Sequence, residues 1–158
     1  MDHDSNNIMV ILSSPSGAGK TTIAKKIQQK FNNIKISVSH TTRLPRSNEV
    51  NGVDYHFVTK KKFEALIKEN QFYEYAKIYE NYYGTLKKNV DQTIKNNDII
   101  FDIDWQGTKQ LTKFKNLKLI KIFLTTRSKQ ELKERLVSRN QNTKEEIDKR
   151  FNSFEEDI

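Results

Sequence analysis

Residues 8–22 read IMVILSSPSGAGKTT and combine three local signals. The first five residues form a short apolar run, which suits a β-strand buried on both faces. The following residues are small and rich in glycine. Apolar residues then recur four apart at Ile23, Ile27 and Phe31, as they do along one face of a helix. A strand, a glycine-rich turn and a helix in this order are the context of a phosphate-binding P-loop.

The residues of this loop have the chemistry that phosphate binding needs. The motif asks for Gly, four residues and then Gly-Lys-Ser/Thr; Gly19, Lys20 and Thr21 fit it, and Ser14 stands at the first glycine position. Backbone N–H groups at a helix N-terminus attract anions. Lys20 can reach the β- and γ-phosphates of a nucleoside triphosphate, and the Thr21 hydroxyl can bind Mg²⁺. The expected triphosphate-binding residues are Ser14, Pro15, Ser16, Gly17, Ala18, Gly19, Lys20, Thr21 and Thr22.

Two further apolar runs predict buried strands. One covers residues 99–103 and contains Asp102, and the other lies around residues 119–124. Asp102 is a candidate for the carboxylate that holds Mg²⁺, partly through water. It is also a candidate for a residue that caps a helix beginning at Trp105, and the sequence leaves both interpretations open.

Length and composition fit one folded domain. The chain has 158 residues, 35% of them apolar, and a formal net charge of +8. It has no cysteine, which excludes disulfides and thiolate metal sites. The polar start does not resemble a signal peptide, and the first apolar run is too short to span a bilayer, so we expect a cytoplasmic protein. A positive surplus attracts polyanions, but it does not distinguish a nucleic-acid binder from a nucleotide binder.

Residues 39–83 differ from the rest of the chain and predict a small β-rich insertion. Short aromatic and β-branched stretches are broken by Pro45 and by Asn51-Gly52, and one helical pattern carries Phe63, Leu66 and Ile67. Further along, Ser128 with Glu131 and Thr143 with Glu146 form capping-box patterns that predict two helix starts.

The insertion also carries side chains suited to a phosphate. Arg43 and Arg46 are three apart, and Tyr55 follows nine residues later. Guanidinium forks and a phenol can hold a phosphate together. Glu74 then lies between tyrosine-rich phrases, the second of which is NYYGT at residues 81–85.

Taken together, these phrases resemble the guanylate kinase family of nucleoside monophosphate kinases. SPSGAGKT (14–21), TTRLPR (41–46), GVDYHF (52–57), NYYGT (81–85) and DIDWQG (102–107) occur in the family's order. The resemblance covers about residues 8–158. It implies an α/β fold in which a P-loop parallel sheet is flanked by helices, with a small β-rich GMP-binding insertion and a helical lid. The implied division is 1–38 and 86–130 for the core, 39–85 for the GMP-binding segment and 131–158 for the lid and the following helix.

The resemblance also implies residue roles. Ser39, Glu74 and Thr85 would read guanine, and Asp104 would help to orient the acceptor. A carboxylate can accept hydrogen bonds from both N1–H and the 2-amino group of guanine, which adenine does not offer in that arrangement. The residues implied to hold the GMP phosphate are Arg43, Arg46, Tyr55 and Tyr83.

Three arginines near the end of the sequence correspond to lid and catalytic positions of the family. By this resemblance Arg135 would bind ATP, and Arg139 and Arg150 would contact the transferred phosphoryl group. The implied reaction is ATP + GMP ⇌ ADP + GDP with Mg²⁺, without a nucleic-acid or membrane partner, and the oligomeric state stays open. The implied catalytic residues are Lys20, Arg43, Arg139 and Arg150.

Two rival functions remain open. A guanylate-kinase-like binding module without catalysis would have no need of the intact Gly19-Lys20-Thr21. A basic nucleic-acid binder would show salt-dependent binding without needing a monophosphate.

Family members usually continue past Ile158, so we expect a last strand, an adenine-contacting loop and a final helix to be lacking here. Activity is therefore expected of the full-length protein more than of this chain. Some aromatic and histidine side chains are expected to pack rather than bind: Tyr73, Tyr75, Tyr79, Tyr82, Trp105, His40 and His56.

Overall fold

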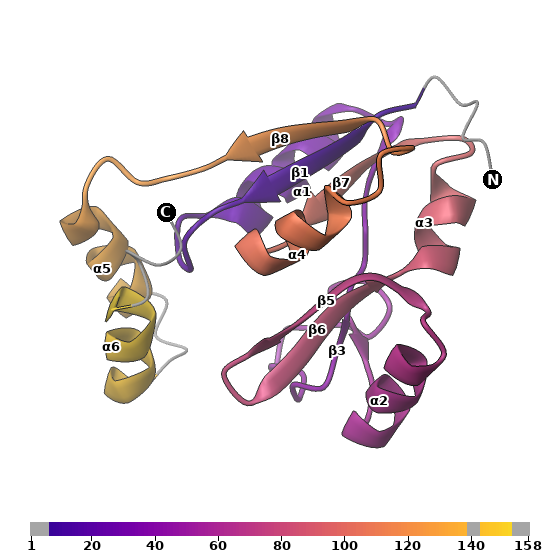
Figure 1. Cartoon of the computed structure of the whole chain (residues 1–158). Coiled ribbons are helices and arrows are strands. Elements are labelled where there is room, and N and C mark those ends of the chain that lie inside the picture. Colours follow the sequence, from indigo (N-terminus) through magenta and orange to yellow (C-terminus); the bar gives the residue numbers. More distant parts are fainter. Residues whose placement is uncertain (1–6, 139–142, 153–158) are drawn as a thin grey trace.

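The computed structural model describes residues 7–138 and 143–152, without the side chains of residues 146, 149 and 150. Two four-stranded sheets organise this part of the chain (Figure 1). The first is parallel throughout and has the strand order β2-β7-β1-β8. Its strands are β1 (Met9–Ser13), β2 (Ile34–Ile36), β7 (Asp98–Asp102) and β8 (Leu119–Phe123).

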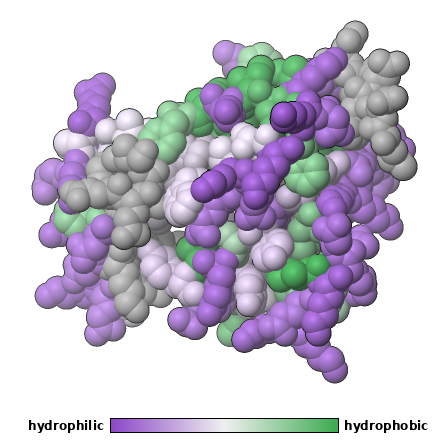
Figure 2. Space-filling view, in the orientation of Figure 1, coloured by the Kyte–Doolittle hydropathy of each residue, from purple (hydrophilic) through white to green (hydrophobic). Residues whose placement is uncertain are grey.

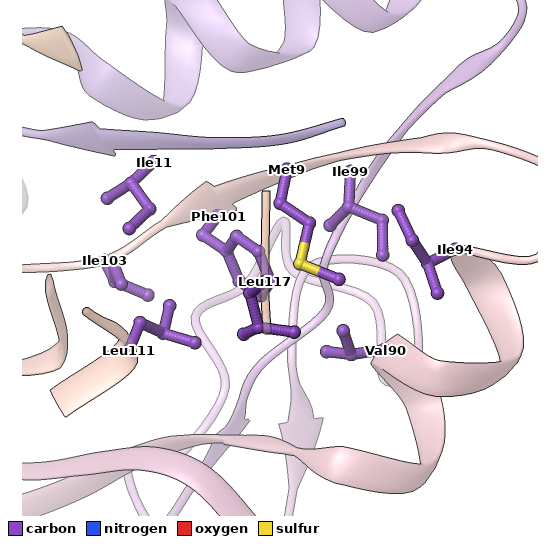
Figure 3. Packing of buried hydrophobic residues seen from close by; sticks show 9 residues of the cluster. All are labelled: Met9, Ile11, Val90, Ile94, Ile99, Phe101, Ile103, Leu111 and Leu117. Carbon is purple, nitrogen blue, oxygen red and sulfur yellow. The ribbon is translucent and has the colours of Figure 1, made fainter. Parts of the chain in front are cut away.

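Helices cover both faces of this parallel sheet because its central strands are apolar on both sides. Leu12 and Ile100 face Ala24 of α1 (Lys20–Lys30). Figure 3 shows the opposite face, where β1 and β7 pack against α3 (Lys87–Thr93) and α4 (Trp105–Leu111). The buried residues of that cluster are Met9, Ile11, Val90, Ile94, Ile99, Phe101, Ile103, Leu111 and Leu117.

The second sheet is built by the middle of the chain and lies beyond α4 in Figure 1. Its strand order is β4-β3-β6-β5, and α2 (Lys60–Lys68) packs against it through Phe63. The ring of Phe63 stacks on Phe72 and on Tyr82, with centroids 4.6 and 5.3 Å apart. The strands are β3 (His40–Thr41), β4 (His56–Phe57), β5 (Phe72–Ile78) and β6 (Asn81–Leu86).

The last two helices are α5 (Lys129–Ser138) and α6 (Lys144–Asn152). The capping prediction for α5 is confirmed, because Ser128 Oγ accepts a hydrogen bond from the N–H of Glu131 at 3.1 Å. The carboxylate of Glu131 accepts from the N–H of Arg127. Leu132 and Leu136 of α5 are buried against Ala18, so this helix packs on the glycine-rich loop.

The predicted fold class, an α/β fold with a parallel sheet flanked by helices, is confirmed, and some local expectations are wrong. Phe31 follows the end of α1 and is 45% exposed, and Trp105 is also 45% exposed instead of packed. Tyr79 is exposed as well, whereas Tyr73, Tyr82 and the partly exposed Tyr75 lie against other aromatic rings, as predicted.

An apolar strip lies on the surface of the described part of the chain. Ile120, Ile122 and Phe123 of β8 are exposed, and Figure 2 shows green atoms along the upper edge of the molecule, where this strand runs. Among the described helices, none is both long and apolar enough to cross a bilayer.

Candidate functional site

The glycine-rich loop between β1 and α1 has a backbone that other residues would adopt only with strain. Gly17 and Gly19 have φ values of +95° and +97°, in the left-handed region that favours glycine. A Cβ on Gly17 would also lie 2.8 Å from the Leu136 side chain. Gly19 is the N-cap of α1, so the loop leads directly into a helix N-terminus, which attracts anions.

Asp102 lies against the start of α1. Lys20 Nζ is 2.9 Å from Asp102 Oδ1, and the Thr21 hydroxyl donates to Asp102 Oδ2 at 2.5 Å. The alternative role of Asp102 as a helix cap is wrong, because Asp104 caps α4 by accepting from the N–H of Gly107 at 2.9 Å.

The oxygens of Thr21 and Asp102 are a donor set that suits Mg²⁺. Both are hard ligands, and they lie at the start of the helix that follows the phosphate loop. In the part of the chain that the structure describes, no three His, Cys, Asp or Glu side chains gather into a metal cluster. A magnesium ion here would therefore take its remaining ligands from nucleotide phosphates and water, as this ion usually does.

Glu74 is a buried carboxylate, only 3% exposed, in β5. It accepts a hydrogen bond from Thr85 Oγ1 at 2.6 Å, and Ser39 Oγ lies 3.4 Å from the same hydroxyl. The structure therefore brings together the three residues that the sequence predicted to read guanine. Burial raises the pKa of Glu74 to about 7, although the Thr85 hydrogen bond opposes this rise. The negative charge of Asp104 adds to the rise and the positive charge of Lys20 opposes it.

Arg43 and Arg46 converge on a residue that the sequence analysis missed, Glu49, and Tyr55 and Tyr83 lie beside Arg43. The Arg43 guanidinium donates to both Glu49 oxygens, at 2.9 and 2.7 Å, and the backbone N–H of Arg46 donates to the same carboxylate at 2.7 Å. The guanidinium carbon of Arg43 lies 5.5 Å from the centre of the Tyr55 ring, and the rings of Tyr55 and Tyr83 are 6.0 Å apart.

The surroundings of Arg43 and Glu49 favour the charged forms of both side chains. Burial alone would raise the pKa of Glu49, but the hydrogen bonds from Arg43 and Arg46 hold it below its usual value. Burial likewise works against the charge of Arg43, yet its hydrogen bond to Glu49 raises its pKa. Both side chains are therefore ionised at neutral pH.

A cleft of about 690 Å³ lies between α1, β2 and the segment 46–55. Lys25 of α1 reaches across it to Asp54, with Lys25 Nζ 2.7 Å from Asp54 Oδ1. Other site residues, among them Glu74, Thr85 and Arg43, do not line this cleft. The predicted site residues that line it are Thr21, Thr22, Ser39, Arg46, Tyr55 and Asp102.

Arg135 is the one predicted lid arginine whose side chain the structure describes. Its Nη1 donates to the backbone carbonyl of Ala18 in the glycine-rich loop at 3.0 Å, and its Nη2 donates to Glu131 at 2.6 Å. The helix α5 therefore places a cation beside the predicted phosphate site. Arg139 and the side chain of Arg150 lie outside what the structure describes.

Comparisons with known proteins agree with this geometry. The family profile described as Guanylate kinase matches residues 6–158. A guanylate kinase of Rickettsia bellii is 45% identical over 152 residues, which are 96% of this chain and 79% of the relative. One from Shewanella violacea is 48% identical over 145 residues, 90% of this chain and 70% of the relative.

The fold is similar to that of a solved member of the same family. The crystal structure of guanylate kinase from Anaplasma phagocytophilum superposes with a TM-score of 0.73 at 30% sequence identity, and the match covers 98% of this chain and 88% of the other. On the family profile and on these relatives, the chain belongs to the guanylate kinase family.

Proposed function

We propose that this chain transfers the γ-phosphoryl group of ATP to GMP, giving ADP and GDP. The observation that carries the proposal is the presence in one molecule of a phosphate-binding loop and a buried carboxylate, Glu74, hydrogen-bonded to Thr85. The first suits a triphosphate and the second suits a guanine base. Membership of the guanylate kinase family supports the same pair of substrates.

Guanine would be read by Glu74, with Ser39 and Thr85 beside it. The carboxylate has two oxygens, so it can accept from N1–H and from the 2-amino group at once. A base that lacks these donors would leave a buried carboxylate without partners, and such a site can reject it by roughly 10⁴-fold. Asp104, whose charge adds to the raised pKa of Glu74, would help to orient the acceptor.

The GMP phosphate would bind at the group around Arg43. Arg43 and Arg46 supply guanidinium donors, and Tyr55 and Tyr83 supply phenol donors. Burial raises the pKa of Tyr55 to about 12, so its hydroxyl keeps its proton and remains a donor at neutral pH. Glu49 would keep the two arginines in place before the phosphate arrives.

ATP would bind along residues 14–22, with Lys20 at the β- and γ-phosphates and Arg135 beside the loop. We propose that Thr21 and Asp102 hold Mg²⁺, which when bound would neutralise phosphate charge. Arg139 and Arg150 keep the catalytic roles predicted for them.

Catalysis then needs little covalent work from the protein. The acceptor is already an anionic phosphate, so no general base is required. Lys20, Arg43 and the lid arginines would align the two phosphates and stabilise the negative charge that spreads during the transfer. Closure of the segment 39–85 and of the lid 131–158 over the core would exclude water and limit hydrolysis of ATP.

The test compares phosphate acceptors. ADP release is measured with ATP and with GMP, AMP, CMP or UMP in parallel, with and without Mg²⁺. We expect turnover with GMP to exceed turnover with the other monophosphates by several orders of magnitude. Equal turnover with all four acceptors would contradict the assignment of Glu74. GMP binding without any turnover would instead favour the silent binding module.

The remaining expectations belong to the same proposal. The protein is expected to act in the cytoplasm on small molecules, without a nucleic-acid or membrane partner. A filter-binding measurement with duplex DNA at low salt checks this point, because a protein built for the DNA backbone would show strongly salt-dependent binding.

A further inference from the structure

The strand that carries Glu74 is held by the core on both sides of that residue. On one side, the Tyr73 hydroxyl donates to Asp91 Oδ1 of α3 at 2.6 Å. On the other side, the backbone of Tyr75 is bound by Gln110 of α4. Tyr73 is therefore held by α3, Glu74 by Thr85 and Tyr75 by α4.

The contact between Gln110 and Tyr75 uses both polar groups of one peptide residue. The N–H of Tyr75 donates to Gln110 Oε1 at 3.1 Å, and its carbonyl accepts from Gln110 Nε2 at 2.6 Å. β5 is an edge strand of its sheet, with β6 on one side only. The N–H and carbonyl of Tyr75 point to the other side, where a further strand would bind them in a larger sheet. The side-chain amide, with one acceptor and two donors, takes the place of that strand.

The same helix closes over the Glu74 carboxylate. Gly107 lies one turn before Gln110, and a Cβ built on it would be 2.5 Å from Glu74 Oε2. Asp104 caps the helix at that end through the N–H of Gly107. One short helix therefore contacts the strand backbone beside Glu74 and limits where its carboxylate can lie.

We infer that Gln110 is a positioning residue for base recognition, which fixes the backbone of β5 so that both oxygens of Glu74 face a guanine ring. This inference rests on the proposed function, because it assumes that Glu74 reads the base. It adds that selectivity for guanine depends on the core helix α4, although Glu74 itself lies in the middle segment. Tyr73 positions the same strand from the other side, through its hydrogen bond to Asp91 of α3.

The test removes the two hydrogen bonds to Tyr75, together with a longer one from Gln110 Nε2 to the carbonyl of Gln106 at 3.4 Å, and keeps the size of the side chain. In Gln110→Met, an unbranched apolar chain of similar length replaces the amide. The matched control is Gln71→Met, directly before β5. The Gln71 side chain is exposed, and among the interactions described it bonds only to the nearby carbonyl of Glu69. Binding of GMP and of IMP, which lacks the 2-amino group, is measured by calorimetry on the full chain, beside kcat and KM for both substrates.

We expect Gln110→Met to weaken GMP binding about tenfold, a typical effect of losing two hydrogen bonds that orient a recognition group. The preference for GMP over IMP should fall, because a displaced carboxylate loses the 2-amino contact first. KM for ATP should stay the same, and Gln71→Met should behave like the unaltered chain. Tyr73→Phe should lower the GMP/IMP preference in the same direction, which keeps the test usable if Gln110→Met does not fold.

Several outcomes would overturn the inference. If both variants lower the melting temperature but keep the GMP/IMP preference, Gln110 and Tyr73 have a structural role only. An equal loss in Gln71→Met would show that the effect is not specific. If the unaltered chain neither binds nor phosphorylates GMP, the proposed function fails and the inference fails with it. If the unaltered chain does both and the Gln110 and Tyr73 variants match it, the inference alone fails.

Discussion

Arg43 and Glu49 form a bidentate ion pair, in which two guanidinium nitrogens lie 2.7 and 2.9 Å from the two carboxylate oxygens. Both side chains are largely shielded from water, and the same carboxylate accepts from the backbone of Arg46. Glu49 therefore fixes two predicted phosphate-binding residues before any substrate arrives. A preorganised cation loses less entropy when the phosphate binds.

Replacing Glu49 by Gln should lower stability and weaken GMP binding together. Because Arg43 keeps its charge but loses a charged acceptor, we expect a loss of about 1–3 kcal/mol in the free energy of unfolding. KM for GMP should rise several-fold with little change in KM for ATP. Urea unfolding and steady-state kinetics measure the two effects.

The lowered pKa of Glu49 gives the sign of a pH effect. Stabilisation by an acid whose pKa is lowered in the folded state is complete above its unfolded value near 4.5, and it is lost as the pH falls further. Glu49→Gln should therefore flatten part of the acid limb of the stability curve. Glu69→Gln, at an exposed carboxylate, serves as the control. An unchanged acid limb in Glu49→Gln would contradict the role of the pair.

Lys20→Ala should lower kcat by about 10²- to 10³-fold, the usual loss when a preorganised charge is removed from the transition state. GMP binding measured without ATP should change much less than kcat, because Lys20 lies at the predicted triphosphate loop and affects Glu74 only by opposing the rise of its pKa. Lys26→Ala tests an exposed lysine on the same helix and should leave kcat unchanged. Wild-type turnover in Lys20→Ala would remove Lys20 from the mechanism.

GMP recognition should depend on pH near neutrality, because the pKa of Glu74 is raised to about 7. The ionised carboxylate accepts both guanine donors, whereas the protonated form loses acceptor strength. KM for GMP should therefore rise as the pH falls through 7, and calorimetry below that pH should detect proton release on GMP binding.

Glu74→Gln separates this effect from the titration of the GMP phosphate, whose own second pKa is near 6. The variant should bind GMP weakly and should lose the part of the pH dependence that centres near 7. ATP binding should change less than GMP binding. An identical profile in both proteins would assign the whole pH dependence to the phosphate and none of it to Glu74.

Gly107→Ala should reduce GMP binding without weakening the helix. The new Cβ would lie 2.5 Å from Glu74 Oε2, so the carboxylate must move. Alanine is favoured over glycine within a helix by about 0.5–1 kcal/mol, so a loss of helix stability cannot explain the result. We expect KM for GMP to rise tenfold or more with KM for ATP unchanged. Lys109→Ala on the same helix is the control.

Local sequence patterns predicted the helices and strands whose structure depends on residues close together in the sequence. The apolar run before the glycines forms β1, and Ser128 caps α5, as the sequence predicted. The strand β2 was missed because it has only three residues, one of them a lysine. α3 was missed because it buries a single residue, Val90, and shows no apolar repeat.

The contacts of the site that escaped prediction form only when the chain is folded, whether the residues are near or far apart in the sequence. Glu49 is one acidic residue in a polar loop, and only the folded chain shows that Arg43 and Arg46 converge on it. Gln110 and Tyr75 are 35 residues apart, and Arg135 and Ala18 are 117 apart. No local spacing rule could pair them, because their approach is set by how α4 and α5 dock.

The ion pair between Lys25 and Asp54 spans the cleft, yet more than half of the Lys25 side chain is exposed to water. Such pairs contribute at most about 1 kcal/mol and weaken as ionic strength rises. A contact this weak can break and reform at ambient temperature. Lys25 and Asp54 thus join the two walls of the cleft by a contact that thermal motion can break. Added salt should weaken this contact and favour the form in which the walls are apart.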